Sequence, residues 1–468
     1  MSGGSAQIHD ARVRSLGGRP AHGGRFVLYW MQQSQRAAGN HALEYAIQRA
    51  NALSLPVRVG FGLTDGYPEA TWRHFQFMVE GLIETAAALD ARGIPFVLRQ
   101  GSPPEVALAL ADGAAELVCD RGYLRHQRRW REEVAAAAPC PVTQVESDAV
   151  VPVAAASTRA ELGARTLRPR ITRRLDEFLV RLNPTPPAVR GGAAAARGVA
   201  LDDPDTVLRG LRLDRSVAPV SRWFRGGTGE ARKRLAAFSR DTLPRYASER
   251  SQPEAGAVSH LSMYLHFGQI SPIDVALAVR DAAGAGDESA AKFVEELIVR
   301  RELGINFVTT TEAYDTWGVL PAWARATLAR HAGDPRPAIY TRAELEDAAT
   351  ADPYFNAAMR EMRFTGYLHN QMRMYWGKKI LEWTPEPEAA HATALALNNR
   401  YLLDGRDPSS FANVGWIFGL HDRPWPERPV FGTVRSMTAG GLERKSDIAA
   451  YVDSVNRRVA EAPARDAP

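Results

Sequence analysis

The segment Phe26-Val27-Leu28-Tyr29-Trp30 is a short unbroken run of apolar and aromatic residues near the start of the sequence. A run of this length is typical of a strand that is covered on both faces, as strands of parallel sheets are. We therefore expect order to begin at Arg25 and this run to be the first strand of an α/β domain.

Strand and helix patterns alternate after this run. Further strands are expected at 57–63, 95–99, 116–119 and 142–145, and helices at 40–53, 72–89, 103–112 and 125–138. Strands that alternate with helices predict a parallel, Rossmann-like sheet with helices on both faces. No G-x-G-x-x-G motif follows the first strand, which argues against a standard dinucleotide site there.

The chain changes character at 184–200, where Pro-Thr-Pro-Pro and Gly-Gly-Ala-Ala-Ala-Ala indicate a linker. Beyond it, strand patterns nearly vanish and helical patterns follow one another, at 229–239, 272–281, 290–307, 321–331, 342–349, 353–383 and 387–400. The expected organisation is a disordered leader (1–24), an α/β domain (25–180), a linker (181–225), a helical domain (226–456) and a tail (457–468).

Composition excludes several classes of protein. The 468 residues contain no apolar run of the length, about 20 residues, that a membrane span needs. The N-terminus lacks an apolar signal core, and two cysteines, Cys119 and Cys140, cannot build a disulfide scaffold or a four-cysteine zinc site. A monomer in a reducing cytoplasm is the expectation.

The basic residues are almost all arginines. Lys and Arg together number 58 against 53 Asp and Glu, yet the chain has only five lysines, at 233, 292, 378, 379 and 445. Arginine suits anionic partners such as phosphate, but GC-rich coding produces the same bias. Local arginine clusters must therefore be judged one at a time.

The densest candidate segment is 366–384, Gly-Tyr-Leu-His-Asn-Gln-Met-Arg-Met-Tyr-Trp-Gly-Lys-Lys-Ile-Leu-Glu-Trp-Thr. On a helix, Arg373, Trp376, Lys379 or Ile380, and Trp383 share one stripe. Such a stripe is core packing or the wall of a cofactor site. An arginine beside it favours the second interpretation, because a buried charge needs a partner.

Three other segments admit two interpretations each. Asn398-Asn399 and the turn Asp404-Gly-Arg-Asp-Pro408 supply a partner for Arg373 or only a helix cap with a surface ion pair. Residues 259–262 form an anion site at a helix start or a plain N-cap. The charges of 295–302 are solvated helical ion pairs or include a carboxylate that points into a pocket.

Together these segments, in this order behind an α/β domain, resemble the class II cyclobutane pyrimidine dimer photolyases of the photolyase/cryptochrome family. The resemblance covers about residues 25–451. Its most specific strings are Tyr29-Trp30-Met31, Gly163-Ala-Arg-Thr-Leu-Arg-Pro-Arg170, Leu265-His-Phe-Gly-Gln-Ile-Ser271, Arg373-Met-Tyr-Trp376, Lys378-Lys-Ile-Leu-Glu-Trp383, Asp404-Gly-Arg-Asp-Pro408 and His421-Asp422.

The resemblance implies a carbon–carbon lyase, a deoxyribodipyrimidine photo-lyase, that repairs pyrimidine dimers in UV-damaged DNA with light. Reduced FAD, U-shaped and buried in the all-α lobe, would donate one electron to the dimer. A deazaflavin or another antenna chromophore would bind in the α/β lobe. Reaching the lesion requires flipping it out of the duplex.

The resemblance also assigns roles residue by residue. It implies FAD contacts at Tyr246, Ser259, His260, Leu261, Ser262, Arg373, Asn398, Asp404 and Asp407. It implies a lesion pocket and catalytic group of Glu296, Met374, Asn398 and Trp416, with Glu296 protonated through burial so that it can stabilise the dimer radical anion. The resemblance places Trp376 and Trp383 in an electron-transfer chain. It assigns DNA contacts to Arg250, Arg300, Arg423, Arg428, Arg435, Arg444 and Lys445.

The chain departs from the family pattern near the expected site. Where the family has Asp-Pro-Leu-Trp-Asn, this chain has Asp352-Pro-Tyr-Phe-Asn356, so phenylalanine replaces the middle tryptophan of the electron chain. Tyr354, Tyr367 and Tyr375 are candidates to substitute for it. Ile305 replaces an acid, Arg250-Ser-Gln-Pro253 replaces Arg-Asn-Asp-Pro, and the run from 416 to 421 is one residue short.

Two other functions compete with repair. A blue-light sensor of the same fold, or an enzyme for another lesion, would keep the flavin. A DNA-binding protein without FAD would keep only the basic face.

Overall fold

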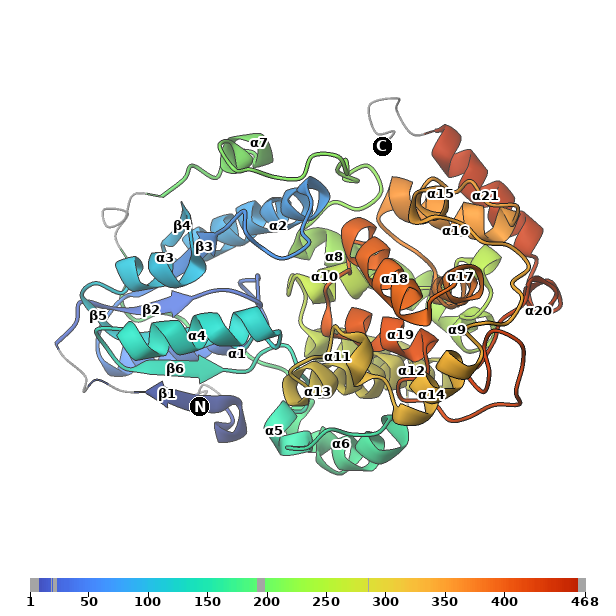
Figure 1. Ribbon diagram of the computed structural model, residues 1–468. Coiled ribbons are helices and arrows are strands. Elements are labelled where there is room, and N and C mark those ends of the chain that lie inside the picture. The colour runs from blue at the N-terminus through green and yellow to red at the C-terminus, as the bar shows by residue number, and fades with distance from the viewer. Residues whose placement is uncertain (1–7, 18, 20–22, 192–197, 285, 462–468) are drawn as a thin grey trace.

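The computed structural model describes residues 8–17, 19, 23–191, 198–284 and 286–461. They form an α/β lobe followed by a helical lobe, which lie side by side in Figure 1. Among the described residues, no helix combines the length and the apolar character that a membrane crossing requires.

Within the described residues the sheet has six strands in the order β1-β6-β5-β2-β3-β4. The bounds are β1 (Val13–Gly17), β2 (Phe26–Trp30), β3 (Val57–Leu63), β4 (Phe96–Gln100), β5 (Ala114–Asp120) and β6 (Val142–Val145). Strands β2 to β6 pair in parallel, whereas β1 pairs antiparallel with β6. The expected parallel α/β arrangement is therefore confirmed, with one antiparallel edge strand added.

Strand β2 is buried at all five positions, as the unbroken apolar run predicts. Its alternate side chains enter two cores. Val27 and Tyr29 pack with α1 (His41–Ala52) and α2 (Trp72–Ala91), whereas Phe26, Leu28 and Trp30 pack with α3 (Pro103–Leu110) and α4 (Arg125–Ala137). Helices thus cover both faces of the sheet.

The expected disorder of the leader does not extend to 10–17. His9 caps a 3₁₀ turn, η1 (Asp10–Arg12), and β1 follows it directly. The buried Arg12 guanidinium donates to the carbonyls of Glu146, Ala149 and Val150, at 3.2, 2.9 and 2.6 Å. Hydrogen-bond partners more than 130 residues away in the sequence order residues 10–17. The composition of the leader does not indicate these partners. Residues 1–7, 18 and 20–22 lie outside the described residues.

The connection between the lobes contains α5 (Val153–Ala156), α6 (Ala164–Phe178) and α7 (Pro204–Leu208). Part of it runs back along the α/β lobe. The Val199 amide donates to the Leu98 carbonyl at 2.8 Å, and Leu182, Leu201 and Leu211 pack on the α/β core. Residues 192–197 of the expected linker lie outside the described residues.

The helical lobe begins at Thr228. Its helices are α8 (Thr228–Ala237), α9 (Leu243–Glu249), α10 (Ser262–His266), α11 (Pro272–Ala283), α12 (Glu288–Val294), α13 (Arg301–Thr310), α14 (Ala322–Arg330), α15 (Arg342–Glu346), α16 (Pro353–Thr365), α17 (Asn370–Trp383), α18 (Pro387–Tyr401), α19 (Pro408–Ile417), α20 (Ala439–Glu443) and α21 (Ile448–Ala460). A π-helical turn, η4 (Glu295–Arg300), joins α12 to α13.

The expected helix over 353–383 is two helices. Helix α16 ends at Gly366, whose φ of +72° is strained for any residue with a Cβ. The Gly366 carbonyl then accepts a hydrogen bond from the Leu403 amide at 2.8 Å. The break lets α17 turn back against α16, which places the Arg373 end of α17 beside the 402–407 turn.

The lobes meet through buried polar groups. Asp120, at the end of β5, accepts from the amides of Gln32, Gln33 and Ser34, and Arg36 pairs with Asp148 at 2.7 Å. The same Arg36 guanidinium donates to the Gly268 carbonyl in the helical lobe at 2.8 Å. These bonds hold the end of the sheet against the loop after α10.

Glu302 makes a second buried contact between the lobes. Its Oε1 accepts from the amides of Val150 and Val151 at 2.6 and 3.3 Å. Burial raises the pKa of Glu302 from about 4.5 to about 8, although the two hydrogen bonds act to lower that pKa. Native Glu302 therefore holds its proton more tightly than the unfolded chain does.

We expect this group to make stability pH-dependent. Because the native state binds the extra proton, the free energy of unfolding falls as pH rises from about 4.5 to about 8. Glu302→Gln keeps the acceptor and cannot titrate, so the wild type should lose stability relative to this variant over that window, on the order of 1 kcal/mol per pH unit. Urea unfolding at several pH values measures it, with exposed Glu288→Gln as control. Parallel curves for wild type and Glu302→Gln would contradict the expectation.

Candidate functional site

A cavity of about 510 Å³ opens in the helical lobe. It is lined by α9, the 258–262 loop, η4, the first half of α17 and both ends of α19. Most of the residues singled out from the sequence line it, namely Tyr246, Arg250, Ser259, His260, Leu261, Ser262, Glu296, Arg300, Arg373, Met374, Asp404, Asp407 and Trp416. The structure thus gathers four separate sequence segments around one space.

Arg373 and Asp404 form the central ion pair of this cavity. Arg373 Nη2 donates to both carboxylate oxygens, at 3.0 and 3.1 Å. The Arg373 side chain is 8% exposed and that of Asp404 13% exposed. Arg373 Nε has no hydrogen-bond partner in the described structure. The partner that the sequence suggested for this buried charge is therefore present, and one donor remains free.

Asn398 lies just behind the cavity wall, near the end of α18. Its amide nitrogen donates to Asn399 Oδ1 at 3.1 Å and to Ser410 Oγ at 3.2 Å. Ser410, which lines the cavity, donates in turn to the Asp404 carbonyl at 2.8 Å. The buried Asn398 Oδ1 has no partner among the described residues. Two hydrogen bonds therefore hold the Asn398 side-chain amide, and its carbonyl oxygen has no partner among the described residues.

Asp407 caps α19 and faces His266. Its carboxylate accepts from the Ser409 amide at 2.8 Å, and its Oδ2 lies 3.3 Å from His266 Nδ1. Burial alone would raise the pKa of Asp407, but the bond to His266 and the charges of His266 and Arg301 hold that pKa below its ordinary value. Asp407 is therefore an anion at neutral pH.

The 258–262 loop differs from the expected helix start. Leu261, not a serine, occupies the N-cap, and α10 has only five residues. His260 adopts a φ of +51° and packs edge-on against Tyr367, with ring centroids 4.6 Å apart. Its Nδ1 has no partner in the described structure, and burial lowers its pKa to about 4, so the ring is neutral at pH 7. The loop offers polar groups to the cavity without a helix dipole behind them.

The expected burial of Glu296 is wrong. Its side chain is 43% exposed, and its Oε1 lies 3.4 Å from Arg250 Nη1. Glu296 lies in the π-helical turn η4, where the next three residues, Leu297, Ile298 and Val299, are buried instead. Glu296 lies at the mouth of the cavity beside Arg250.

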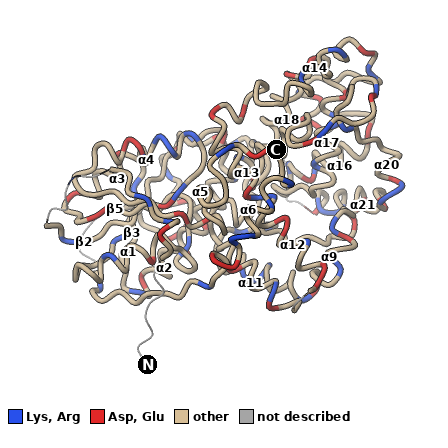
Figure 2. Tube along the Cα trace, turned by 90° about the horizontal axis from the view of Figure 1, so that it is seen from below, with Lys and Arg blue, Asp and Glu red and all other residues tan. Residues whose placement is uncertain are grey.

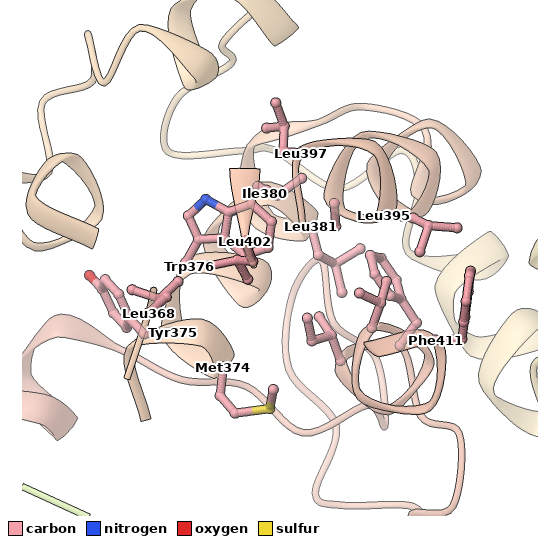
Figure 3. Packing of buried hydrophobic residues seen from close by; sticks show 14 of the residues in the cluster. Leu368, Met374, Tyr375, Trp376, Ile380, Leu381, Leu395, Leu397, Leu402 and Phe411 are labelled. Atoms are coloured by element: carbon pink, nitrogen blue, oxygen red, sulfur yellow. The ribbon is translucent and has the colours of Figure 1, made fainter. Parts of the chain in front are cut away.

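Met374 and Trp416 bound another part of the cavity. Met374 is buried on α17, and Figure 3 shows it leaving that helix in a different direction from Trp376. Trp416 lies at the end of α19 and is partly exposed, with the Arg435 guanidinium 5.8 Å from its ring centroid. The two side chains supply apolar surfaces to the cavity wall.

The aromatic stripe of α17 is both core and site. Trp376 and Ile380 are fully buried and pack with Leu381, Leu397 and Leu402 (Figure 3). Phe355 and Trp383 are also buried, with ring centroids 5.1 Å apart. Phe355 thus lies against Trp383, and Trp376 and Trp383 lie outside the cavity lining.

The expected DNA-contact residues fall into two groups. Arg250 and Arg300 line the cavity. Arg423, Arg428, Arg444 and Lys445 are exposed, and Arg435 lies between the rings of Trp416 and Trp425, 5.8 and 4.9 Å from their centroids. Elsewhere, basic and acidic residues are interspersed over both lobes (Figure 2).

Sequence reasoning missed several cavity residues, among them Arg301, Asn370, Ser409, Ser410 and Asn413. The string Asp407-Pro-Ser-Ser is a helix-start signal that could have placed Ser409 and Ser410 at the beginning of α19. Arg301 and Asn370 lie within the segments 295–302 and 366–384 that the sequence singled out, but only the packing of α13 and α17 brings these two residues to the wall.

A second, smaller cavity of about 80 Å³ lies where the two lobes meet. Trp30, Phe61 and Trp130 of the α/β lobe and His266 and Arg406 of the helical lobe line it. Arg406 is 3% exposed, and its Nε and Nη1 have no partner in the described structure. Burial lowers its pKa to about 10, so it stays a cation at neutral pH.

Comparison with known proteins is consistent with this architecture. The DNA photolyase family model matches residues 27–189. The deoxyribodipyrimidine photo-lyase of Methanothermobacter thermautotrophicus is 46% identical, with 96% of this chain and 98% of that protein covered. That of Oryza sativa subsp. japonica is 39% identical, with 98% and 92% covered.

Solved structures show the same fold. A bacterial class III photolyase from Agrobacterium tumefaciens superposes with a TM-score of 0.73 at 18% identity, covering 95% of this chain and 90% of that one. An archaeal photolyase from Sulfolobus tokodaii with two FAD molecules gives 0.67 at 15% identity, covering 94% and 95%. The two lobes therefore define the photolyase/cryptochrome architecture. Because the photo-lyases of Methanothermobacter thermautotrophicus and Oryza sativa are 46% and 39% identical over 96% and 98% of this chain, the chain belongs to the DNA photolyase family.

The Arg373–Asp404 pair gives a stability test. Asp404→Ala leaves a buried guanidinium uncompensated and should cost about 3–5 kcal/mol of unfolding free energy, whereas Arg373→Met with Asp404→Leu should cost less. Urea denaturation measures both. Glu230→Ala, which breaks an exposed pair with Lys233, should cost less than about 1 kcal/mol. A double variant less stable than Asp404→Ala would contradict this expectation.

Proposed function

We propose that this protein is a class II cyclobutane pyrimidine dimer photolyase, which splits pyrimidine dimers in UV-damaged DNA with light. The observation that carries the proposal is a single cavity lined by the buried Arg373–Asp404 pair and by Glu296, Met374 and Trp416, with the Asn398 amide bonded to Ser410 of its wall. One end of this space suits a charged aromatic cofactor, and the other end suits flat apolar bases.

FAD fits the residues present. A cavity of about 510 Å³ is within the size range of cofactor sites. Its surroundings hold unused hydrogen-bonding atoms of both kinds, the donor Arg373 Nε and the acceptor Asn398 Oδ1, and also His260 Nδ1. A flavin ring, which presents donors and acceptors along its edge, would satisfy them. When bound, reduced FAD supplies the electron for dimer splitting after it absorbs near-UV or blue light.

The chain's residues then have separate tasks. Arg373 places a positive charge where an anionic ring is bound, and burial strengthens that attraction. Asp404 holds the guanidinium in place, and Asn398 presents its carbonyl to a ring N–H. Tyr246 and residues 259–262 contact the ribose and phosphates.

The open side of the cavity receives the flipped lesion. Met374 and Trp416 offer apolar surfaces to the two bases. These surfaces replace the base stacking that a dimer loses when it leaves the duplex. Glu296 and Arg250 lie 3.4 Å apart at the mouth, where they can bond the polar edges of the bases. Arg300 and the exposed arginines and lysine at 423–445 contact phosphates.

The smaller cavity is the proposed site for one ring of an antenna chromophore such as a deazaflavin, because its volume of about 80 Å³ is well below that of a whole cofactor site. Trp30, Phe61 and Trp130 would enclose an aromatic ring, and the free Nε and Nη1 of Arg406 would bind an anionic oxygen on it. The solved archaeal photolyase from Sulfolobus tokodaii, which has the same fold, holds two FAD molecules, and this supports the proposal of a second chromophore site.

A repair assay tests the main proposal. Chemically reduced, flavin-loaded protein should remove dimers from DNA under blue light and leave them in the dark. Glu296→Gln, which loses a charged hydrogen-bonding group at the lesion, should lower repair per absorbed photon by about tenfold or more. Glu288→Gln, an exposed glutamate away from the cavity, should repair as the wild type does.

Protein that binds flavin yet repairs nothing under these conditions would overturn the proposal and favour the light-sensor alternative or another lesion. Protein without flavin absorbance would favour a DNA-binding role alone. The monomeric state and the cytoplasmic location remain part of the proposal, and sedimentation in the presence of damaged DNA tests the former.

The basic rim gives a second test. Arg423→Ala or Arg428→Ala should weaken DNA binding and reduce the slope of log affinity against log salt by about 0.9 for each phosphate that the variant no longer neutralises. Fluorescence anisotropy at several salt concentrations measures this slope. Arg240→Ala, exposed in the helical lobe and paired with Asp241, is the matched control. Unchanged slopes would remove these residues from the DNA face.

A further inference from the structure

Phe355 stands where the family pattern has the middle tryptophan of the electron chain, and it lies beside Trp383. It is fully buried, and its ring lies edge-on to Trp383 with centroids 5.1 Å apart. A phenyl ring is far harder to oxidise than an indole ring, so Phe355 cannot carry a positive hole from one tryptophan to the other. If the chain photoreduces its cofactor, the hole must leave Trp376 in another way.

Trp383 is also a poor place for a positive charge. Lys379 Nζ lies 5.3 Å from the Trp383 ring centroid and 5.4 Å from that of Tyr375, with its side chain 12% exposed. Glu382, at 2.7 Å, offsets part of this ammonium charge. A tryptophan radical cation beside Lys379 would still be repelled by it. A residue that loses a proton as it loses an electron would avoid this repulsion.

Tyr375 is such a residue. It directly precedes Trp376 on α17 and is fully buried. Its hydroxyl donates a short hydrogen bond to Asp352 Oδ2. Asp352 caps α16 through its other oxygen, which accepts from the amides of Tyr354 and Phe355 at 2.9 and 3.0 Å. Tyr375 therefore has a fixed carboxylate to take its proton.

Tyr354 continues the path outward. Its ring centroid is 6.5 Å from that of Tyr375, and its hydroxyl donates to Oε1 of the exposed Glu443 at 2.8 Å. Each tyrosine thus has its own carboxylate. Where the family pattern reads Leu-Trp, this chain reads Tyr354-Phe355, so the oxidisable ring has moved by one residue toward the surface.

We propose that Tyr375 and Tyr354 form a proton-coupled route that carries the oxidising equivalent from Trp376 to the surface, in place of the tryptophan that Phe355 replaces. This inference rests on the proposed function, because the oxidant that takes the first electron from Trp376 is a photoexcited, oxidised flavin.

Protons and electrons balance at each step of the route. The Trp376 radical cation takes one electron from Tyr375, the phenolic O–H bond breaks, and the proton moves to Asp352, which leaves a neutral Tyr375 radical. Tyr354 then gives one electron to Tyr375, which recovers its proton from Asp352, while the Tyr354 proton moves to Glu443. A soluble thiol finally returns one electron and one proton to Tyr354, and Glu443 releases the proton it holds.

The test uses flavin-loaded protein with the flavin oxidised, illuminated with a thiol present. Electron paramagnetic resonance of samples frozen during illumination should show a neutral tyrosyl radical. Photoreduction should be slower in D₂O than in H₂O, because a proton moves with the electron. Tyr375→Phe removes one oxygen atom and should abolish the tyrosyl signal and slow photoreduction by about tenfold or more.

Three further variants sharpen the result. Tyr354→Leu, which keeps Tyr375, should leave a tyrosyl radical that decays back to the ground state instead of reacting with thiol. Tyr375→Phe combined with Phe355→Trp should recover photoreduction, now with a tryptophanyl signal. Tyr340→Phe is the matched control, because Tyr340 packs on Trp383 at 5.1 Å and lies outside the proposed route. Equal flavin content and melting temperature verify that each variant folds.

A tryptophanyl radical in the wild type that persists in Tyr375→Phe would overturn the proposal. So would an absent isotope effect, a loss of the signal in Tyr340→Phe alone, or a wild type that is not photoreduced. Repair by chemically reduced protein separates the two hypotheses: Tyr375→Phe should then repair as the wild type does. A failure of the reduced wild type to repair overturns the proposed function, and the radical spectra still decide the tyrosine route.

Discussion

A buried guanidinium needs a fixed carboxylate, and the pairing of Arg373 with Asp404 meets that need at the centre of the helical lobe. The pair joins α17 to the turn before α19. From this turn, Ser410 bonds the Asp404 carbonyl, Asn398 bonds Ser410, and Asp407 begins α19. Each of these groups would lose its place if Asp404 moved, so the pair orders one wall of the cavity.

The same turn serves both cavities. Asp404 and Asp407 face the larger one, whereas Arg406, with a φ of +65°, points its guanidinium into the smaller one. His266 lines the smaller cavity and Asp407 the larger, and their facing atoms are 3.3 Å apart. This polar contact lies between the two spaces, and the buried Arg36 guanidinium, paired with Asp148, joins the lobes near it through its bond to the Gly268 carbonyl. Two chromophores bound there would be close neighbours with a rigid wall between them.

Local patterns predicted the parts of this structure that depend on local physics. The run at 26–30 predicted a doubly covered strand, because five apolar residues leave no face for water. The spacing of Arg373, Trp376 and Trp383 predicted a shared helix face. The resemblance to a known family then predicted that the cavity residues share one site. The spacing of these residues along the sequence could not have predicted this.

Other features depend on contacts that sequence patterns do not record. Strand β1 forms because Arg12 reaches carbonyls more than 130 residues away. Glu296 is exposed within a π-helical turn that the sequence does not reveal, because the pattern of 290–307 fits a continuous helix equally well. The Tyr375–Asp352 bond joins residues on separate helices whose antiparallel packing begins at Gly366.

Polar and charged groups hold both ends of helix α19, which forms one wall of the cavity. Asp407 caps its N-terminus, and the buried Lys378 ammonium donates to the Ile417 carbonyl at its C-terminus. An anion at the N-terminus and a cation at the C-terminus both suit the helix dipole. Burial lowers the pKa of Lys378 to about 7, and the negative charge of nearby Asp422 opposes this shift. Ten residues rising about 1.5 Å each place Trp416 at a fixed distance from Asp407. The cavity thereby gains a wall of constant length, because Asp407 holds one end of the helix and the Lys378 side chain holds the other.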